Sequence, residues 1–177
     1  ASMNNQFESV SSFGPFKSGF KDTGIHQSSV YSSLQFNNQK GFFADAGFRL
    51  NKHSIYGNSS TFTFNPSFAV SEQLRIFGSV ATAFKTPSLF QLFDSFSGRR
   101  DLKAETSTTI EAGFSHSYTG FTSRLVAFYR NTNNGIDYDY VRNKYYNFIK
   151  QTAFGVEYET SIRLSNLDMC HPIREEP

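Results

Sequence analysis

The chain has 177 residues, enough for one domain or for a piece of a larger one, and its formal charge of +2 gives no reason to expect a nucleic-acid partner. No run of about 18 apolar residues occurs, which excludes membrane-spanning helices. The single cysteine, Cys170, excludes an intrachain disulfide and a zinc site with several cysteines. The 21 Phe and 9 Tyr favour β-strands, because these side chains suit pleated, half-buried surfaces.

The first 27 residues are rich in Ser, Gly and Asn, and Gly14-Pro15 and Gly19 interrupt any regular pattern. We therefore predict that residues 1–27 form a loop or an irregular edge. Regular patterning begins at residue 28 and continues to about residue 165.

Seven segments within residues 28–165 alternate apolar and polar residues with a period of two. In Gly41–Asn51, for example, Phe42 and Phe48 share one parity, whereas Asp45 and Arg49 share the other. This alternation predicts strands with one apolar and one polar face. The seven segments are Ser28–Asn38, Gly41–Asn51, Thr61–Val70, Leu74–Phe84, Ile110–Tyr118, Phe121–Arg130 and Phe154–Leu164.

These predicted strands are about 9–12 residues long, whereas strands of soluble sheets most often have about 5–6. A tilted strand needs about 10 residues to cross a bilayer. The predicted connections alternate between tight turns, at Asn38–Lys40, Ser71–Gln73 and Thr119–Gly120, and long loops, at Lys52–Ser60, Lys85–Glu105 and Thr132–Lys150. Tight turns at one end and long loops at the other are typical of outer-membrane barrels. We predict an all-β fold, an antiparallel up-and-down meander of about 7–8 long strands that forms part of a transmembrane β-barrel.

A soluble β-sandwich binding module, such as a secreted carbohydrate binder, would use the same alternation with one buried face per sheet. Strand length and the loop asymmetry favour the barrel over this alternative. An isolated piece of barrel exposes two edges and an apolar surface, so such a fragment is expected to associate with copies of itself or to close into a small barrel.

The most specific motif lies in Ala81–Phe114. Phe84-Lys85-Thr86-Pro87 is followed by Leu89 and Leu92, then by Leu102-Lys103-Ala104-Glu105 and by Glu111-Ala112-Gly113. In this order the elements resemble the barrel signature of TonB-dependent outer-membrane receptors of the vitamin B12 and siderophore branches. The sequence departs from that signature where Arg100-Asp101 replaces Asn-Pro and where Ala104 replaces Pro.

Further elements recur downstream in the family's order: Tyr129-Arg130-Asn131, Ile136-Asp137-Tyr138, Tyr145-Tyr146-Asn147 and Gly155-Val156-Glu157. The resemblance covers residues 28–164, and the tail, residues 166–177, does not share it.

The resemblance implies a barrel of about 22 strands with a plug in its lumen, in the outer membrane of a Gram-negative bacterium. It implies uptake of a siderophore, cobalamin or an oligosaccharide, with energy delivered by the TonB complex. The implied partners are the lipid bilayer and the TonB complex, which is reached through a plug that this sequence lacks. We expect the fragment itself to be transport-incompetent, and we expect neither an enzyme nor a cofactor.

Ligand contacts are expected in two predicted loops. Arg99 and Arg100 offer bidentate contacts to an anionic ligand. Residues 132–150 offer carboxylates and aromatic platforms, at Asp137, Tyr138, Asp139, Tyr140, Tyr145 and Tyr146. In the alternative interpretation, the arginines are simply solvated and residues 132–150 extend a hairpin above the membrane.

The remaining motif residues are expected to be structural. Pro87 has no N–H to donate to a ladder, so it belongs at a strand end, and the leucines after it are expected to anchor the loop. No metal site is predicted, because Cys170-His171 has no partners. The structural set is Phe84, Lys85, Pro87, Leu89, Leu92, Leu102, Glu105, Glu111 and Gly113.

Overall fold

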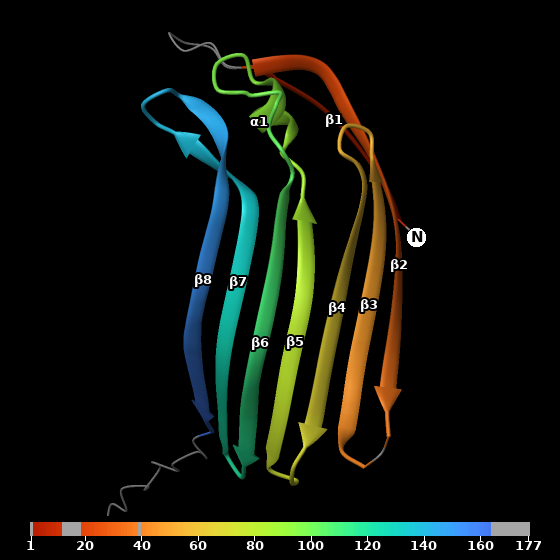
Figure 1. Cartoon of the computed structure of the whole chain (residues 1–177), viewed down its shortest axis with the longest axis vertical. Helices are drawn as coiled ribbons and strands as arrows, with labels where there is room; N and C mark the ends of the chain where they lie inside the picture. Colours follow the sequence, from red (N-terminus) through yellow and green to blue (C-terminus); the bar gives the residue numbers. More distant parts are fainter. Residues whose placement is uncertain (1, 12–18, 39, 164–177) are drawn as a thin grey trace, which may run out of the picture.

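The computed structural model describes residues 2–11, 19–38 and 40–163, with side chains from residue 24 onward. Eight antiparallel strands form one sheet in which each strand pairs with its neighbour in sequence. Figure 1 shows a single layer of long, bowed strands, with the short helix α1 at one end. The elements are β1 (Ser2–Ser11), β2 (Gly19–Asn37), β3 (Phe42–His53), β4 (Gly57–Ala69), β5 (Leu74–Lys85), α1 (Leu89–Phe93), β6 (Glu105–Tyr118), β7 (Phe121–Asp139) and β8 (Lys144–Ile162).

This arrangement confirms the predicted all-β, antiparallel meander. Within the described ranges no second sheet packs on the first, so the β-sandwich alternative is wrong. Strands β1 and β8 do not pair with each other in the described part of the chain, so the sheet remains open. Across the same residues, no helix is long and apolar enough to span a membrane.

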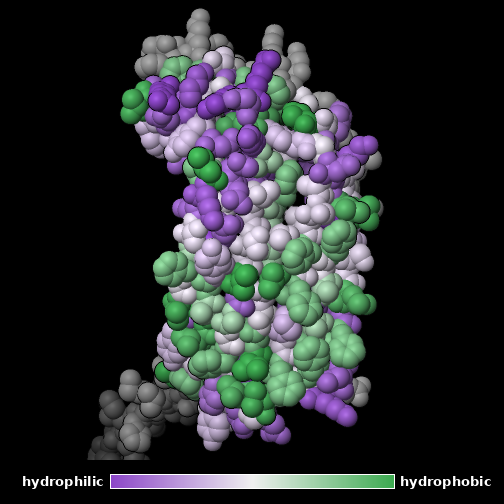
Figure 2. Space-filling view, in the orientation of Figure 1, coloured by the Kyte–Doolittle hydropathy of each residue, from purple (hydrophilic) through white to green (hydrophobic). Residues whose placement is uncertain are grey.

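One face of the sheet carries a continuous apolar band. The register places Phe48 opposite Phe62 and Ile76 opposite Phe114, so the apolar parities of neighbouring strands coincide. Figure 2 shows hydrophobic side chains gathered over the lower part of the sheet and hydrophilic ones above them. The band consists of Val30, Leu34, Phe36, Phe48, Leu50, Phe62, Phe64, Phe68, Ile76, Ile110, Phe114, Tyr129, Phe154, Val156, Tyr158 and Ile162, all of which are exposed.

The opposite face is polar, and its side chains bond across the strands. Asn65 Nδ2 donates to Asp45 Oδ2 at 3.3 Å, and Ser79 Oγ donates to Asn65 Oδ1 at 2.8 Å. These bonds join β3, β4 and β5. Arg75 Nη1 donates to Ser67 Oγ at 3.1 Å and adds a second link between β4 and β5. Side-chain hydrogen bonds on the polar face thus link β3, β4 and β5 in addition to the backbone ladder.

Aromatic rings on the polar face lie over glycines of the neighbouring strand. A Cβ on Gly113 would lie 2.9 Å from Phe77 Cζ, and one on Gly155 would lie 3.0 Å from the ring of Phe128. A Cβ on Gly135 would overlap the ring of Phe148. The register pairs are Phe77–Gly113, Phe128–Gly155 and Phe148–Gly135.

The connections differ between the two ends of the sheet. At one end, β2–β3, β4–β5 and β6–β7 are joined by short turns. Asn38 Oδ1 accepts from Lys40 N at 2.8 Å and from Phe42 N at 3.0 Å, and Gly120 adopts a φ of 73°, which favours glycine. At the other end, only the connection between β5 and β6, residues 86–104, is long among the described residues.

Two of the three predicted long loops are therefore wrong. Residues 52–60 contain only the three-residue connection 54–56 between β3 and β4. Residues 132–150 belong mostly to β7 and β8, which continue as a hairpin up to the connection 140–143. The extended-hairpin alternative is the correct one there. Both stretches lie beyond the apolar band, where a strand has polar residues on both faces and loses the alternation that identifies it.

The N-terminal prediction also needs correction. Residues 2–11 form β1, and the first nine residues of β2 lie within the segment 1–27 that was predicted as a loop. The pairing of β1 with β2 does shift in register between Glu8 and Val10, and β1 is a sheet edge, as the irregular-edge alternative implies. The predicted tail, residues 166–177, lies outside the described residues.

Candidate functional site

The connection 86–104 begins where β5 ends and is anchored by its apolar residues. Ser88 caps α1, because its Oγ accepts from Gln91 N at 3.2 Å while Gln91 Oε1 accepts from Ser88 N at 2.9 Å. Pro87 and Leu89 are fully buried. Leu92 and Leu102 are each 3% exposed, so the connection has a small core of its own.

Helix α1 contacts β2, three strands away from β5 in the sheet, so the connection crosses the end of the polar face. Figure 1 shows α1 at the end of the sheet opposite the short turns. The strand residues before it follow the ladder: Phe84 pairs with Thr106, and Lys85 pairs with Glu105.

A compact turn after α1 presents the two predicted arginines. Asp94 Oδ2 accepts from Ser97 N at 2.7 Å and from Ser97 Oγ at 2.6 Å. Gly98 N donates to Asp94 O at 2.9 Å, and a Cβ on Gly98 would overlap the backbone of Asp94. Arg99 N donates to Gln91 O at 2.8 Å, which ties the turn back to the helix. The position of Arg99 is thus set by backbone bonds.

The guanidinium of Arg99 is already engaged. Its Nε donates to Asp101 Oδ1 at 2.6 Å and its Nη2 to Asp101 Oδ2 at 2.8 Å. These bonds lower the pKa of the Asp101 carboxyl and raise the pKa of Arg99. Arg100 lies over a ring instead, with its guanidinium carbon 5.4 Å from the Phe93 centroid.

The β7–β8 hairpin carries the other predicted ligand residues on a row of rings. Tyr138 contacts Tyr140 and Tyr145 with centroid separations of 5.1 and 5.0 Å. Tyr145 also contacts Phe90 of α1 at 6.4 Å, nearly perpendicular. Burial, then the neighbouring Tyr138, raises the pKa of Tyr145. The rings therefore connect the tip of the hairpin to the connection 86–104.

The acids of this hairpin mainly shape its turn. Asp139 Oδ1 accepts from Val141 N at 2.9 Å and from Arg142 N at 3.0 Å, and these bonds lower the pKa of Asp139. Arg142 Nε lies 3.7 Å from Asp139 Oδ2. Asp137 Oδ1 accepts from the adjacent Tyr138 N at 2.8 Å.

A hollow of about 580 Å³ lies between the two segments, and we call it the charged hollow. Of the predicted ligand residues, four line it and four do not. Those in the lining are Arg99, Asp139, Tyr145 and Tyr146, and those outside it are Arg100, Asp137, Tyr138 and Tyr140. Its lining holds three cationic side chains and one carboxylate, and Asp101 pairs with Arg99, so three positive and two negative charges leave the charged hollow with a net charge of +1. Its complete lining is Arg99, Asp139, Val141, Arg142, Lys144, Tyr145, Tyr146 and Asn147.

Sequence reasoning missed Arg142 and Lys144. Arg142 and Lys144 are exposed residues around a turn, and such residues are usually only solvated. The signal that could have identified them is their place within three residues of Tyr145 and Tyr146, two adjacent aromatic residues in a polar stretch.

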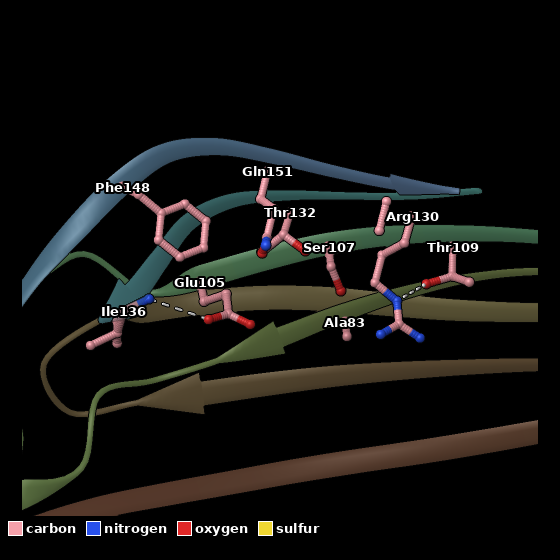
Figure 3. Close-up of a pocket in the computed structure, with 10 residues that line it drawn as sticks. Ala83, Glu105, Ser107, Thr109, Arg130, Thr132, Ile136, Phe148 and Gln151 are labelled. Carbon is pink, nitrogen blue, oxygen red and sulfur yellow. Dashed lines mark hydrogen bonds between the residues drawn. The ribbon is translucent and has the colours of Figure 1, made fainter. Parts of the chain in front are cut away.

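A second hollow, of about 650 Å³, lies on the polar face and is lined mainly by residues of β6, β7 and β8 (Figure 3). Figure 3 shows Glu105 and Arg130 toward its two ends, with Ser107 between them and the ring of Phe148 at one side. Arg130 Nε donates to Thr109 Oγ1 at 3.2 Å, and Glu105 Oε2 accepts from Ile136 N at 3.4 Å. The remaining lining residues are Ala83, Thr132, Ile136, Gln151 and Ala153.

The last two motif residues also lie on the polar face. Glu111 lines a smaller hollow of about 260 Å³ together with Arg124, Arg130 and Glu157. Gly113 lies beneath the ring of Phe77, and it also approaches Leu125 O so closely that a Cβ would overlap it. Among the residues that the structure describes, no three His, Cys, Asp or Glu side chains are grouped to hold a metal ion.

A buried histidine supports the β3–β4 turn. His53 is 3% exposed, and its Nδ1 accepts from Ile55 N at 3.1 Å and from Tyr56 N at 3.3 Å. Burial lowers the pKa of His53 and raises that of Tyr56. Tyr56 Oη donates to Leu102 O at 2.9 Å, so this turn holds the connection 86–104 from the side opposite the β7–β8 hairpin.

Comparison with known proteins gives consistent results. A sequence model of the family described as TonB dependent receptor-like, beta-barrel, matches residues 2–169. The vitamin B12 transporter BtuB of Vibrio cholerae is 26% identical over 123 residues, which are 67% of this chain and 20% of the relative. The chain thus spans about a fifth of the length of this curated relative.

Two solved structures share the fold. The siderophore receptor PirA from Pseudomonas aeruginosa superposes with a TM-score of 0.69 at 20% identity, over 88% of this chain and 36% of that one. The ferric enterobactin receptor PfeA from Pseudomonas aeruginosa, in complex with enterobactin, gives a TM-score of 0.67 at 16% identity, over 88% of this chain and 32% of that one.

Proposed function

The chain belongs to the TonB-dependent receptor-like β-barrel family, and we propose that it forms part of the wall of a Gram-negative outer-membrane transporter, which takes up a scarce ligand with energy from the TonB complex. The apolar band carries this proposal. It continues from β2 to β8 in register, and the face behind it is polar and hydrogen-bonded. A barrel wall between lipid and a wet lumen needs this asymmetry.

The two ends of the sheet supply the orientation. In outer-membrane barrels the short turns face the periplasm and the long connections face the outside. The turns at 38–41, 70–73 and 119–120 would then be periplasmic. The connection 86–104, the β7–β8 hairpin and the charged hollow would face the medium from which the ligand comes.

We assign ligand contact to the charged hollow. Arg99, Arg142 and Lys144 outnumber two carboxylates, Asp139 in the lining and Asp101 paired with Arg99, so one positive charge remains and the hollow favours an anionic ligand. Tyr145 and Tyr146 add aromatic surface to the same lining. An anionic ferric siderophore fits this combination better than cobalamin or a neutral oligosaccharide, and the names of PirA and PfeA as siderophore receptors agree with it.

The 177-residue piece alone is not expected to transport. Its described strands leave the edges β1 and β8 unpaired, so they enclose no lumen. Those edges and the apolar band are expected to make the isolated piece self-associate or require detergent.

Uptake by the full-length receptor tests the proposal. We would express the receptor in a Gram-negative strain that lacks its own receptors for ferric enterobactin and vitamin B12, with and without TonB. Fractionation should place it in the outer membrane, and ⁵⁵Fe-labelled ferric enterobactin should enter only with TonB present. Vitamin B12 uptake instead would overturn the ligand class, and a soluble receptor or absence of any TonB-dependent uptake would overturn the function.

A charge variant tests the charged hollow within the same assay. The triple substitution R99A/R142A/K144A should weaken ferric enterobactin binding while leaving outer-membrane assembly intact. The matched control is Lys52→Ala. It removes an exposed cation next to the last residue of β3, at the same end of the sheet as the charged hollow. Equal affinity of the triple variant and this control would contradict the assignment.

A further inference from the structure

We infer that Asn147 is a positioning residue that joins the connection 86–104 and the β7–β8 hairpin into one unit and so fixes Arg99 relative to Tyr145 across the charged hollow. This inference rests on the proposed function, because it concerns the geometry of the ligand site proposed there. It adds a role for a side chain that sequence reasoning placed only within a motif.

Asn147 uses its whole side-chain amide in bonds to backbone. Its Oδ1 accepts from Lys103 N at 2.8 Å. Its Nδ2 donates to Lys103 O at 3.0 Å and to Asn134 O at 2.7 Å. A primary amide has two N–H donors, so both are engaged. Lys103 is held by both of its backbone polar groups, 44 residues away in sequence.

The third bond falls where the hairpin departs from regular pairing. The ladder pairs Asn133 with Lys150 and Gly135 with Phe148, and it omits Asn134 between them. Asn134 has a φ of 52°, a left-handed conformation that Asn tolerates better than most residues. The Asn147 amide donates a hydrogen bond to the carbonyl of Asn134 and so stabilises this irregular point of β7.

Other contacts between the same two segments lie on either side of Asn147. Tyr145 N donates to Ser97 O at 3.1 Å, and the rings of Tyr145 and Phe90 meet at 6.4 Å. Just past the connection, at the first residue of β6, Glu105 Oε2 accepts from Ile136 N at 3.4 Å. Asn147 is central among these contacts and is the one whose side chain bonds to both segments' backbones.

The charged hollow depends on this junction because its walls come from both segments. Arg99 belongs to the connection, and every other lining residue belongs to β7, β8 or the turn between them. Arg99 lies two residues from Ser97 and four from Lys103, between the two backbone attachment points. Without Asn147, the bond from Tyr145 N to Ser97 O and the contact between Tyr145 and Phe90 still join the two walls, but Lys103 is released. The position of Arg99 relative to Tyr145 should then vary more.

A distance measurement in the full-length receptor tests the junction without any ligand. Spin labels on Ser95→Cys and Val141→Cys, both at exposed positions, report the separation of the connection and the hairpin when Cys170 and any other cysteine are replaced by Ser. The spin-labelled receptor that retains Asn147 should give one narrow distance distribution, and Asn147→Ala should broaden that distribution at least twofold. An unchanged distribution in Asn147→Ala overturns the inference.

Three further variants make the measurement specific. Asn147→Asp keeps the acceptor for Lys103 N and loses both donated bonds, so it should also broaden the distribution, and it serves if the Ala variant fails to assemble. Lys103→Ala should not broaden it, because Asn147 contacts only the backbone of Lys103. Asn58→Ala makes the same chemical change at an exposed position of the β3–β4 hairpin and should also have no effect.

Ligand affinity distinguishes positioning from simple stability. With ferric enterobactin as the probe, Asn147→Ala should raise the Kd about tenfold, as expected for losing about 1–1.5 kcal/mol of net bonding. In an Arg99→Ala background it should add almost nothing, because the group that it positions is gone. Full additivity of the two losses overturns the role for Arg99. If the receptor that retains Asn147 does not bind ferric enterobactin, the proposed function is contradicted. The distance measurement still shows whether Asn147 joins the connection to the hairpin.

Discussion

Strands β6 and β7 pass through two different regions along their length. In the lower region Ile110 and Phe114 lie in the apolar band, and the polar residues between them face the opposite side. In the upper region β7 continues through Asn131 and Asn133 to the tyrosines of the hairpin, with polar residues on both faces. The structure of the lower region depends on which face of each strand is apolar. The upper region is specified by particular hydrogen bonds, such as those of Asn147 and Tyr56.

The difference indicates where each kind of substitution should matter. A charge in the apolar band should destabilise the inserted barrel, most strongly near mid-membrane and less toward the ends of the band. In the upper region a charge should be tolerated, whereas the loss of one bonding group or one buried leucine should release a local segment. Four predictions test this division, from the largest expected effect to the smallest.

Phe114→Lys should have the largest effect. A lysine on a lipid-facing side costs up to about 2–4 kcal/mol, the upper values applying at mid-membrane, and the lost burial of Phe adds about 1.5–3 kcal/mol. Urea titration of the receptor refolded into lipid vesicles measures this loss. Ser115→Lys, one residue further on the polar face, is the control and should cost far less. Equal losses for the two variants would show that the band does not face lipid.

Leu89→Ala should release the connection 86–104 while leaving the strands intact. Leu89 is completely buried in the small core beside Pro87, and Leu→Ala in a core typically costs about 2–5 kcal/mol, here at the lower end because the core is small. Hydrogen exchange should show faster exchange for amides 86–104 and unchanged exchange for β6. Uniformly faster exchange across the sheet would contradict an independent core. Phe90→Ala, at a half-buried neighbour, is the comparison and should have a smaller effect.

These two predictions also mark how far the sequence could lead. The alternation of Phe62 and Phe64 with Thr and Asn was sufficient to predict a strand and its apolar side, because one face of β4 is apolar there. Gly57, Asn58 and Ser59 begin the same strand but have no apolar parity, and they were interpreted as a loop. Helix α1 has five residues, too few for a helical period to be recognised.

The candidate site was less predictable than the fold for a related reason. Arg99 and Tyr145 were identified by residue type, and the structure places both in one hollow. The contribution of Asn147 was not predictable, because its partner is the backbone of a residue 44 positions away. A backbone partner leaves no trace in the identity of Lys103.

Tyr56→Phe should have a moderate effect confined to the upper region. It removes the bond from Tyr56 Oη to Leu102 O and keeps the ring, so the expected loss is about 1 kcal/mol. Exchange of the amides near Leu102 should accelerate several-fold, without a change at Ile110. The chemically identical change Tyr31→Phe, on the polar face of β2, is the control and should leave residues near Leu102 unaffected.

The smallest expected effect is a pH dependence of the β3–β4 turn. Burial lowers the pKa of His53 below the ordinary 6.5, so folding favours the neutral ring, whose Nδ1 accepts two backbone bonds. This contribution to stability is present above about pH 6.5 and is lost as the pH falls toward the lowered pKa. Amides 55 and 56 should lose protection between pH 7.5 and 5.5 after correction for intrinsic exchange. His53→Gln should remove that pH dependence, and its persistence would assign it to another group.

The pairing of rings with glycines on the polar face has a consequence for the free width of a passage that this face would line. Phe77, Phe128 and Phe148 each fill the space that a side chain on the facing glycine would occupy. In a closed barrel these bulky groups would lie flush with the wall and would not narrow the passage. Replacing Gly155 by a larger residue would tilt the ring of Phe128 inward, so the free width available to a moving ligand is governed by residues that have no side chain.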